Sequence, residues 1–205
     1  MVNKVIGVGL QKTGTSSLRT AYDILGLERG HWGADRLTTI NDAELLSKTI
    51  EITHGVQACA NNPWPKYYRE LSETFPNAQF ILTVRDEVDW AKSCSKYFQD
   101  RDWPELDWFY GVGHYAGNED VFLDRYRQHN RDVQDFFQGQ PGRLLVFNPT
   151  EGEGWKELCD FIGVEVPNVP FPHSNAGGSF RAAVQQRYVP WAAKLIKLAD
   201  PVLGA

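Results

Sequence analysis

Residues 4–18 read KVIGVGLQKTGTSSL, and this stretch decides the fold. Its first part, residues 4–9, is a short apolar run that ends in glycine, as is typical of a buried strand. From Thr15 onward, apolar or small side chains recur at helical spacing as far as Leu25, and Gly26 ends the pattern. A glycine-containing turn therefore joins a strand to a helix. Backbone N–H groups and the helix dipole converge there and favour an anion.

The turn differs from two common nucleotide-binding loops. Gly9 and Gly14 have the spacing of the triphosphatase P-loop, GxxxxGK[ST], but Thr15 follows where that loop carries its lysine. The lysine of this chain is Lys12, inside the turn. The dinucleotide pattern GxGxxG is disfavoured because Lys12 also occupies its third glycine position. The structural alternative is a glycine turn whose hydroxyl side chains only cap the helix.

The rest of the chain alternates between strand and helix patterns. Further strands are expected at residues 56–60, 79–84 and 143–147. Helices are expected at residues 41–50, 65–75, 86–97, 119–138, 150–162 and 180–198, with capping boxes at Asn41 with Glu44 and at Thr150 with Glu153. Residues 98–118 are aromatic, rich in turns and without a period. The alternation predicts a three-layer α/β/α fold with a central parallel sheet, formed by one domain over residues 1–205.

Composition narrows the class of protein. The chain has 205 residues, of which 42% are hydrophobic and 23% charged, as in ordinary globular domains. Its net charge of −5 disfavours a broad surface for nucleic acid or anionic membranes. No apolar run approaches the length of about 18 residues that a membrane span requires, and Gly7 comes too early for a signal peptide. Three scattered cysteines favour reduced thiols in the cytoplasm, and no metal site is expected.

Two motifs together resemble the sulfotransferases that use 3′-phosphoadenosine 5′-phosphosulfate (PAPS). The first is residues 11–18, QKTGTSSL, which resembles their 5′-phosphosulfate loop. The second is the strand FILTV at residues 80–84 followed by Arg85, with Ser93 eight residues later on the next helix. In the family, an arginine and a serine so placed hold the 3′-phosphate. The resemblance covers about residues 4–25 and 56–181 and is closest to the short soluble bacterial and fungal members.

The resemblance implies a role for each matching residue. Lys12 would neutralise charge on the bridging oxygen and on the transferred sulfuryl group, without magnesium. The 5′-phosphate would be held by the backbone amides and hydroxyl groups of residues 13–17, namely Thr13, Gly14, Thr15, Ser16 and Ser17. Arg85 and Ser93 would hold the 3′-phosphate, with Arg181 as a further candidate from the C-terminal segment, residues 171–205. The product would be 3′-phosphoadenosine 5′-phosphate (PAP).

The general base is left open by the sequence. Relatives place His or Asp two residues before a proline after the second strand, but Asn61 occupies this position here, and an amide accepts protons poorly. Asn61 would then orient the acceptor while a histidine acts as base, with His31 and His114 ranked ahead of His54. Carboxylates of the 98–118 segment are a second set of candidates, namely Asp102, Glu105 and Asp107. A third interpretation is a chain that binds PAPS and transfers poorly.

Residues 97–115 carry aromatic and acidic side chains together. As a substrate lid, this segment would bind the acceptor through Trp103, Asp107, Trp108 and Tyr110. Such a wall suits a cationic or aromatic small molecule. The structural alternative is a surface loop that folds its aromatic side chains onto the core.

Three functions remain in competition at this stage. The first is a cytoplasmic sulfotransferase that transfers the sulfuryl group of PAPS to a hydroxyl or nitrogen of a small molecule. The second is a P-loop kinase, disfavoured by the absence of lysine at position 15 and by the pair of Arg85 and Ser93. The third is a non-catalytic nucleotide-binding module, supported by Asn61. The identity of the acceptor, the choice of oxygen or nitrogen, and the oligomeric state are open.

Overall fold

The computed structural model describes residues 3–32, 41–99 and 103–173. Within them, four parallel strands form one sheet in the order β2-β1-β3-β4. The strands are β1 (Val5–Gly7), β2 (Ala58–Cys59), β3 (Gln79–Thr83) and β4 (Leu144–Phe147). Each lies inside a predicted strand segment. The predicted parallel sheet is therefore confirmed.

Strand order fixes where a ligand is expected. From β1 the chain passes to β2 on one side. From β3, which lies on the other side of β1, it passes outward to β4. The segments that leave the carboxyl ends of β1 and β3 therefore diverge, and a crevice at such a switch point is the usual ligand site of open α/β sheets. The predicted phosphate loop follows β1, and Arg85 follows β3.

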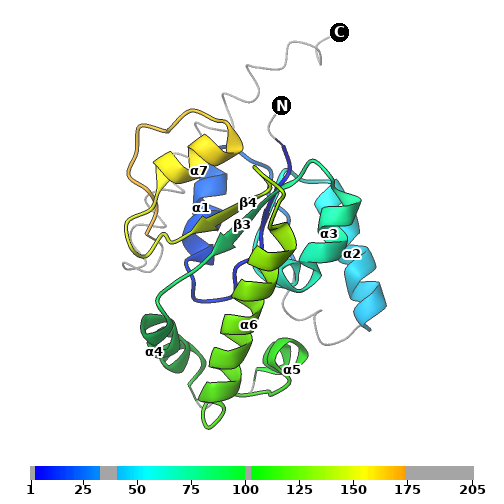
Figure 1. Cartoon of the computed structure of the whole chain (residues 1–205), viewed down its shortest axis with the longest axis vertical. Coiled ribbons are helices and arrows are strands. Elements are labelled where there is room, and N and C mark those ends of the chain that lie inside the picture. The colour runs from blue at the N-terminus through cyan, green and yellow to red at the C-terminus, as the bar shows by residue number, and fades with distance from the viewer. Residues whose placement is uncertain (1–2, 33–40, 100–102, 174–205) are drawn as a thin grey trace.

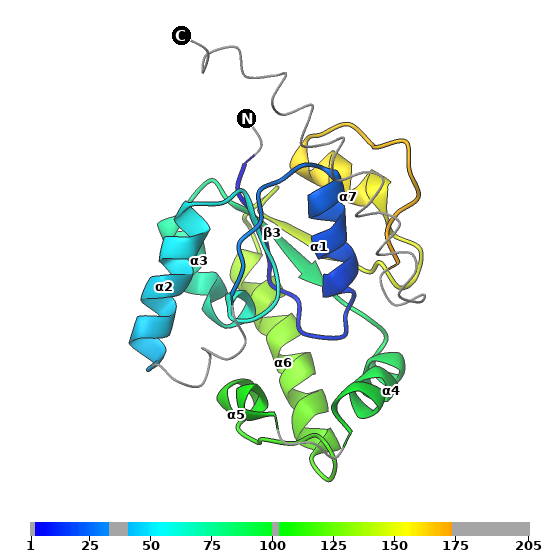
Figure 2. The same ribbon diagram turned by 180° about the vertical axis from the view of Figure 1, so that it is seen from behind.

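Helices cover both faces of the sheet, because successive side chains of a strand point to opposite faces. Val5 and Ile81 pack with the side chains of α1 (Thr15–Ile24) and α7 (Trp155–Ile162). Ile6 and Phe80 pack toward the other layer, which consists of α2 (Asp42–His54), the 3-10 helix η2 (Trp64–Tyr67), α3 (Tyr68–Thr74) and α6 (Glu119–Phe137). Figures 1 and 2 show these layers from the two sides. The three-layer α/β/α architecture is thus confirmed.

A separate cluster of aromatic side chains lies beside the sheet. It joins α4 (Glu87–Phe98), α5 (Pro104–Tyr110) and the first half of α6 (Figure 1). Tyr110 stacks on Phe122 with ring centroids 3.9 Å apart, and Trp90 stacks on Tyr126 at 4.3 Å. These contacts attach α4 and α5 to α6, which itself packs on the sheet.

Two local predictions are wrong. Residues 98–118 were expected to lack regular structure, but α5 forms within them. This helix has seven residues, too few for a helical period to stand out from the aromatic side chains around it. The helix start predicted at Thr150 is also wrong, since α7 begins at Trp155. The capping glutamate is Glu157, whose side chain accepts a hydrogen bond from the backbone N of Gly154 (2.8 Å). The predicted helix over 180–198 lies outside the described residues.

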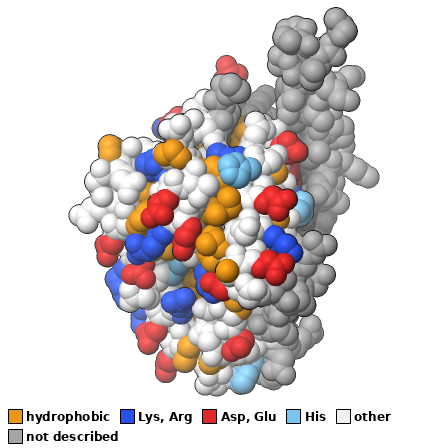
Figure 3. All heavy atoms as spheres, turned by 90° about the vertical axis from the view of Figure 1, so that its right-hand side faces the viewer, with side chains coloured by type: hydrophobic (Ala, Val, Ile, Leu, Met, Phe, Trp, Pro, Cys, Tyr) orange, Lys and Arg blue, Asp and Glu red, His pale blue; other side chains and the backbone are white. Residues whose placement is uncertain are grey.

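Charges on the layer of α2 and α3 are mixed. Figure 3 shows this face, on which acidic and basic side chains intermingle around apolar ones. In the described part of the chain, no helix is both long and apolar enough to cross a bilayer. The same residues contain no group of three or more histidine, cysteine, aspartate or glutamate side chains suited to a metal ion.

Candidate active site

The loop between β1 and α1 is pressed against the end of β3. A Cβ atom on Gly9 would lie 2.0 Å from Oγ1 of Thr83 and 2.5 Å from its backbone oxygen, so only glycine fits there. Thr13 is fully buried, and its hydroxyl donates to the backbone oxygen of Leu10 (2.6 Å) and lies 2.6 Å from the hydroxyl of Thr83. The side chain of Thr13 therefore holds the loop together and is not available to a ligand.

The N-terminus of α1 has no side-chain cap. Gly14 is the N-cap residue, with φ of 97°, and it has no side chain that could accept a hydrogen bond from the first turn. A Cβ atom there would lie 2.5 Å from Cγ of Pro149 and would also be strained by the positive φ. The start of the first turn, at Thr15 and Ser16, therefore faces the crevice without an oxygen from the N-cap side chain. This is the arrangement that favours an anion at a helix N-terminus.

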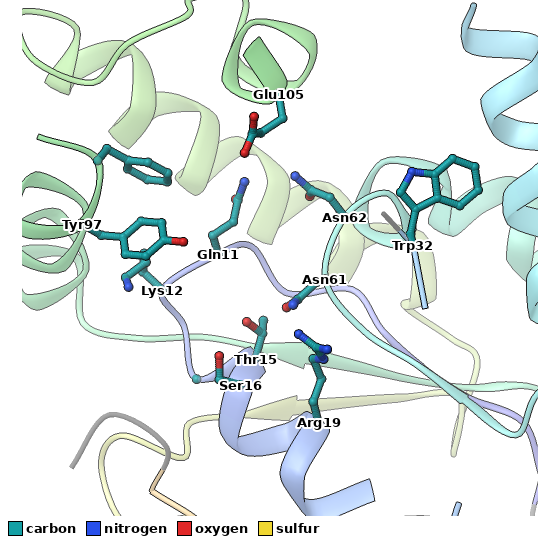
Figure 4. A pocket seen from close by; sticks show the side chains of 12 residues that line it. Gln11, Lys12, Thr15, Ser16, Arg19, Trp32, Asn61, Asn62, Tyr97 and Glu105 are labelled. Carbon is teal, nitrogen blue, oxygen red and sulfur yellow. The ribbon is translucent and has the colours of Figure 1, made fainter. Parts of the chain in front are cut away.

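One of two neighbouring depressions at this end of the sheet, lined by twelve residues, is a cavity of about 360 Å³ (Figure 4). Its lining comes from the phosphate loop, α1, the segments before α2 and after β2, α4 and α5. The residues are Gln11, Lys12, Gly14, Thr15, Ser16, Arg19, Trp32, Asn61, Asn62, Tyr97, Phe98 and Glu105. Six segments, drawn from residues 11–105, thus surround one space. We call it the loop cavity.

The second depression, of about 500 Å³, brings Arg85 and Ser93 together. Its lining residues are Lys12, Arg85, Asp89, Lys92, Ser93, Lys96 and Tyr97. Four of these side chains are cationic and one is a carboxylate, Asp89, which pairs with Lys92 at 3.1 Å. We call this space the cationic cavity. Its excess of positive charge favours an anionic group.

Lys12 and Tyr97 line both cavities. The ammonium group of Lys12 lies 3.9 Å from the centre of the Tyr97 ring, and Lys12 itself has φ of 69°. Burial lowers the pKa of Lys12 below its ordinary value; the Cys94 thiol opposes this shift, and the nearby Arg85 guanidinium adds to it. An anion bound between Lys12 and Arg85 would offset the cost of bringing these two cations together.

Arg85 is held by contacts to its backbone. The hydroxyl of Tyr126 accepts from the backbone N of Arg85 (2.9 Å) and donates to its backbone oxygen (2.7 Å). The guanidinium donates to the backbone oxygen of Lys12 over 3.4 Å, while its buried Nε has no hydrogen-bond partner among the described residues. An unsatisfied buried donor of this kind fits an anionic ligand, because an orphaned donor is costly.

Of four further predicted residues, two lie within the part of the chain that the structure describes. Asn61 lines the loop cavity, has φ of 76°, and its buried Oδ1 has no partner in the described part of the chain. Ser17 is buried in the first turn of α1 and does not line the cavity. Arg181 lies outside the described residues, as does Asp102.

The candidate histidines lie away from the loop cavity. His31 is exposed and lines a different depression with Trp32, while His54 packs edge-on against Phe75. His114 is exposed in the segment between α5 and α6 and is not among the residues that line the cavity. Asp107, a candidate both as base and for substrate contact, is exposed on α5 and outside the lining as well. The structure thus brings none of these four side chains to Lys12.

Three aromatic residues predicted to contact substrate instead support the lining. Trp103 stacks on Tyr97 at 5.5 Å between ring centroids. Trp108 donates from its indole nitrogen to Oδ1 of Asp42 (3.3 Å), which joins α5 to α2. Tyr110 is buried, and its hydroxyl donates to Oε1 of Gln11 (2.9 Å). Tyr97 and Gln11, rather than their aromatic supports, face the cavity.

Sequence reasoning missed Arg19 and Trp32 in the lining. A signal for Arg19 exists in the sequence, because it follows Thr15 by four residues and therefore lies one turn further along the same face of α1. Figure 4 shows its side chain directed toward Asn61. Trp32 precedes residues outside the described part, and no pattern in the sequence assigns it to the site.

Comparison with known proteins decides the family. The model of the sulfotransferase domain matches residues 4–115 and 105–180, which is most of the chain and includes both cavities. The chain belongs to the sulfotransferase domain family. This confirms the resemblance carried by residues 11–18 and by Arg85 with Ser93.

Two individual proteins are similar to this member of the sulfotransferase domain family. The first is the Ava biosynthesis cluster protein M of Aspergillus versicolor, 26% identical over 212 residues, which cover 83% of this chain and 80% of that protein. The second is the solved sulfotransferase domain from the olefin synthase of Synechococcus PCC 7002. It is 13% identical with a TM-score of 0.49, over 100% of this chain and 91% of that domain.

Proposed function

We propose that this protein is an enzyme that transfers the sulfuryl group of PAPS to a hydroxyl or amine nitrogen of a small molecule and releases PAP. One observation carries the proposal. The loop cavity at the N-terminus of α1 and the cationic cavity at Arg85 share the side chain of Lys12. PAPS has two anionic ends, a 5′-phosphosulfate and a 3′-phosphate, and two adjoining anion sites suit it.

The two ends of the donor are assigned by the chemistry of each cavity. The N-terminus of α1, through the backbone amides and hydroxyls of Thr15 and Ser16, would receive the 5′-phosphosulfate. Arg85 and Ser93 would receive the 3′-phosphate through the guanidinium, whose Nε has no partner within the described structure, and through the serine hydroxyl. The cations around them, Lys92 and Lys96, add to the attraction.

Transfer of a sulfuryl group is an in-line displacement, in which positioning and charge stabilisation supply most of the acceleration. Lys12 lies between the two cavities, where charge develops on the oxygen that leaves with PAP. The acceptor would enter the remainder of the loop cavity, which Trp32, Asn61 and Glu105 surround. Aromatic and polar groups together line small-molecule sites, so a small acceptor fits better than a macromolecule.

The experiment is thermal unfolding with PAP, adenosine 5′-phosphosulfate, ADP, and ATP with magnesium. A ligand at 100 times its Kd adds about 2.7 kcal/mol, which is a rise in Tm of roughly 5–11 °C for a chain of this size. We expect this rise with PAP, and its loss in Arg85→Ala. Arg131→Ala, an exposed arginine on α6, is the matched control and should keep the rise.

Other outcomes discriminate between the rival functions. A larger rise with ATP and magnesium than with PAP would support a kinase instead. A rise with PAP but no release of PAP from PAPS, with water or any acceptor, would support the non-catalytic binding module. No rise with any of the four ligands would contradict a nucleotide site at this loop.

A further inference from the structure

Among the residues that the structure describes, one carboxylate lines the loop cavity. Its ionisable lining residues, among those that the structure describes, are Lys12, Arg19, Tyr97 and Glu105. Lys12 and Arg19 are cations, and the ring of Tyr97 contacts the ammonium of Lys12 and stacks on the indole of Trp103. Glu105 is therefore the lining residue whose side chain is built to accept a proton. Figure 4 shows its carboxylate directed into the cavity, across from Thr15 and Ser16.

Packing of α5 on its neighbours fixes the position of Glu105. It stands in the first turn of α5, next to Leu106, which is fully buried. The far end of α5 is fixed by Tyr110, stacked on Phe122 of α6, and by the indole of Trp108 on Asp42 of α2. Two neighbouring helices thus determine where the carboxylate stands.

Two amide groups point at this carboxylate. In Figure 4 the terminal amides of Gln11 and Asn62 are directed toward Glu105 from either side. The orientation of Gln11 has a physical cause, since the Tyr110 hydroxyl donates to its Oε1 (2.9 Å) and leaves its NH₂ group facing the cavity. Burial holds the pKa of Tyr110 well above its ordinary value, so the phenol stays protonated and remains a donor. Amide NH₂ groups placed in this way are donors that can orient the carboxylate.

We propose that Glu105 is the general base of the transfer reaction, with Gln11 and Tyr110 as its positioning residues. The inference rests on the proposed function. The carboxylate of Glu105 takes the proton from the O–H or N–H group of the acceptor molecule. The carboxamide of Glu105→Gln cannot take up this proton. The acceptor atom then forms its bond to sulfur as the bond from sulfur to the 5′-phosphate oxygen of PAP breaks. That electron pair remains on the phosphate oxygen, beside Lys12.

This assignment accounts for the amide at position 61. With Glu105 of α5 as the general base, Asn61 after β2 is not required to accept a proton. Asn61 keeps a buried Oδ1 without a partner in the described residues, which suits it to accept a hydrogen bond from the acceptor molecule. The proton acceptor and the orienting group are thus on opposite walls, carried by α5 and by the segment after β2.

The test compares Glu105→Gln with Asp107→Asn, a matched loss of charge two residues along the same helix and outside the lining. The readout is PAP released from PAPS, with water alone and with added 2-naphthol, tyramine or 4-nitrophenol. We expect Glu105→Gln to lower kcat about 10²–10⁴-fold, the usual worth of a general base, and Asp107→Asn to leave it unchanged. PAP should raise the Tm of both variants as in the wild type, which shows that both fold and keep the donor site.

Two further readouts separate a base from a merely structural residue. The loss should be smallest with 4-nitrophenol, which ionises near neutral pH and needs no base. The fall of kcat toward acid pH should disappear in Glu105→Gln. The charged or titratable groups that face Glu105 across the cavity are Lys12 of the loop, Arg19 of α1 and Tyr97 of α4, and all remain in the variant.

The outcomes distinguish the two proposals. Wild-type protein that binds PAP but releases none from PAPS would overturn the proposed function, and this inference with it. If the wild type is active and the kcat of Glu105→Gln lies within about threefold of the wild-type value, the assignment of Glu105 as general base is overturned while the proposed function stands. An equal loss with every acceptor, including 4-nitrophenol, would also overturn the assignment.

Discussion

The two cavities of this protein are built differently. The floor of the loop cavity and the pair of Arg85 and Ser93 in the cationic cavity come from two sequence motifs, each within nine residues, placed at the ends of adjacent strands β1 and β3. The acceptor side, by contrast, is assembled from the segments before α2, after β2, and on α4 and α5. A site made by backbone geometry leaves a readable motif, whereas a wall made by packing of distant helices does not.

The donor side depends on a close backbone approach, and the largest expected effect breaks it. A Cβ atom on Gly9 would lie within 2.6 Å of three atoms of Thr83, two of them backbone. Gly9→Ala must therefore separate the loop from β3, and we expect a loss of about 3 kcal/mol in the free energy of unfolding, together with weaker binding of PAP. Gly113→Ala is the control, because nothing lies within 4 Å of its added methyl group. Equal stability of the two variants in urea would contradict this account of the loop.

The sequence predicts the donor side well for the same reason. Gly9, Lys12 and Gly14 carry constraints that act within the loop, so their spacing is visible without the fold. Arg85 with Ser93 is visible because a strand and the following helix fix their separation. The roles of these residues stay predictions, but their convergence on adjoining cavities is a feature of the structure.

The acceptor side could be predicted only in part. Glu105 was one of three carboxylates left open, since nothing in residues 98–118 distinguishes it from Asp107. Only the packing of α5 on α6 decides which of the two side chains faces the cavity. The same packing explains the aromatic residues. Tyr110 was assigned to substrate contact, yet burial against Phe122 leaves only its hydroxyl to act, through Gln11.

The second expected effect concerns the support beneath the loop. His129 of α6 is buried, and its Nε2 lies 2.7 Å from the backbone oxygen of Val8, at the start of the loop. Burial lowers its pKa from 6.5 to about 4, so the ring is neutral in the folded protein near pH 7. Between these pKa values the unfolded chain binds a proton that the folded chain does not. The stability contributed by neutral His129 is thus complete above pH 6.5 and falls as the pH drops toward 4.

The measurement is urea unfolding at several pH values. We expect the free energy of unfolding to fall by about 2 kcal/mol between pH 7 and pH 5 through this one group. His129→Gln keeps a nitrogen donor for Val8 but does not titrate, so its stability should vary less over the same range. A wild type and a variant with parallel pH profiles would show that His129 is not the group responsible.

The smallest expected effect sharpens the comparison most, because it tests whether the buried aromatic cluster acts on the site. Tyr110→Phe removes one hydroxyl and retains the ring stacked on Phe122. Without its donor, Gln11 no longer has a fixed orientation toward Glu105, and we expect kcat to fall about tenfold, or about 1.4 kcal/mol, with PAP binding unchanged.

The decisive measurement is a double-mutant cycle, since the effects of residues that act through one another are not additive. In a Glu105→Gln background, Tyr110→Phe should have almost no further effect on kcat, because the group that it positions is gone. Additive losses would mean that the hydroxyl stabilises the fold around the cavity and not the base.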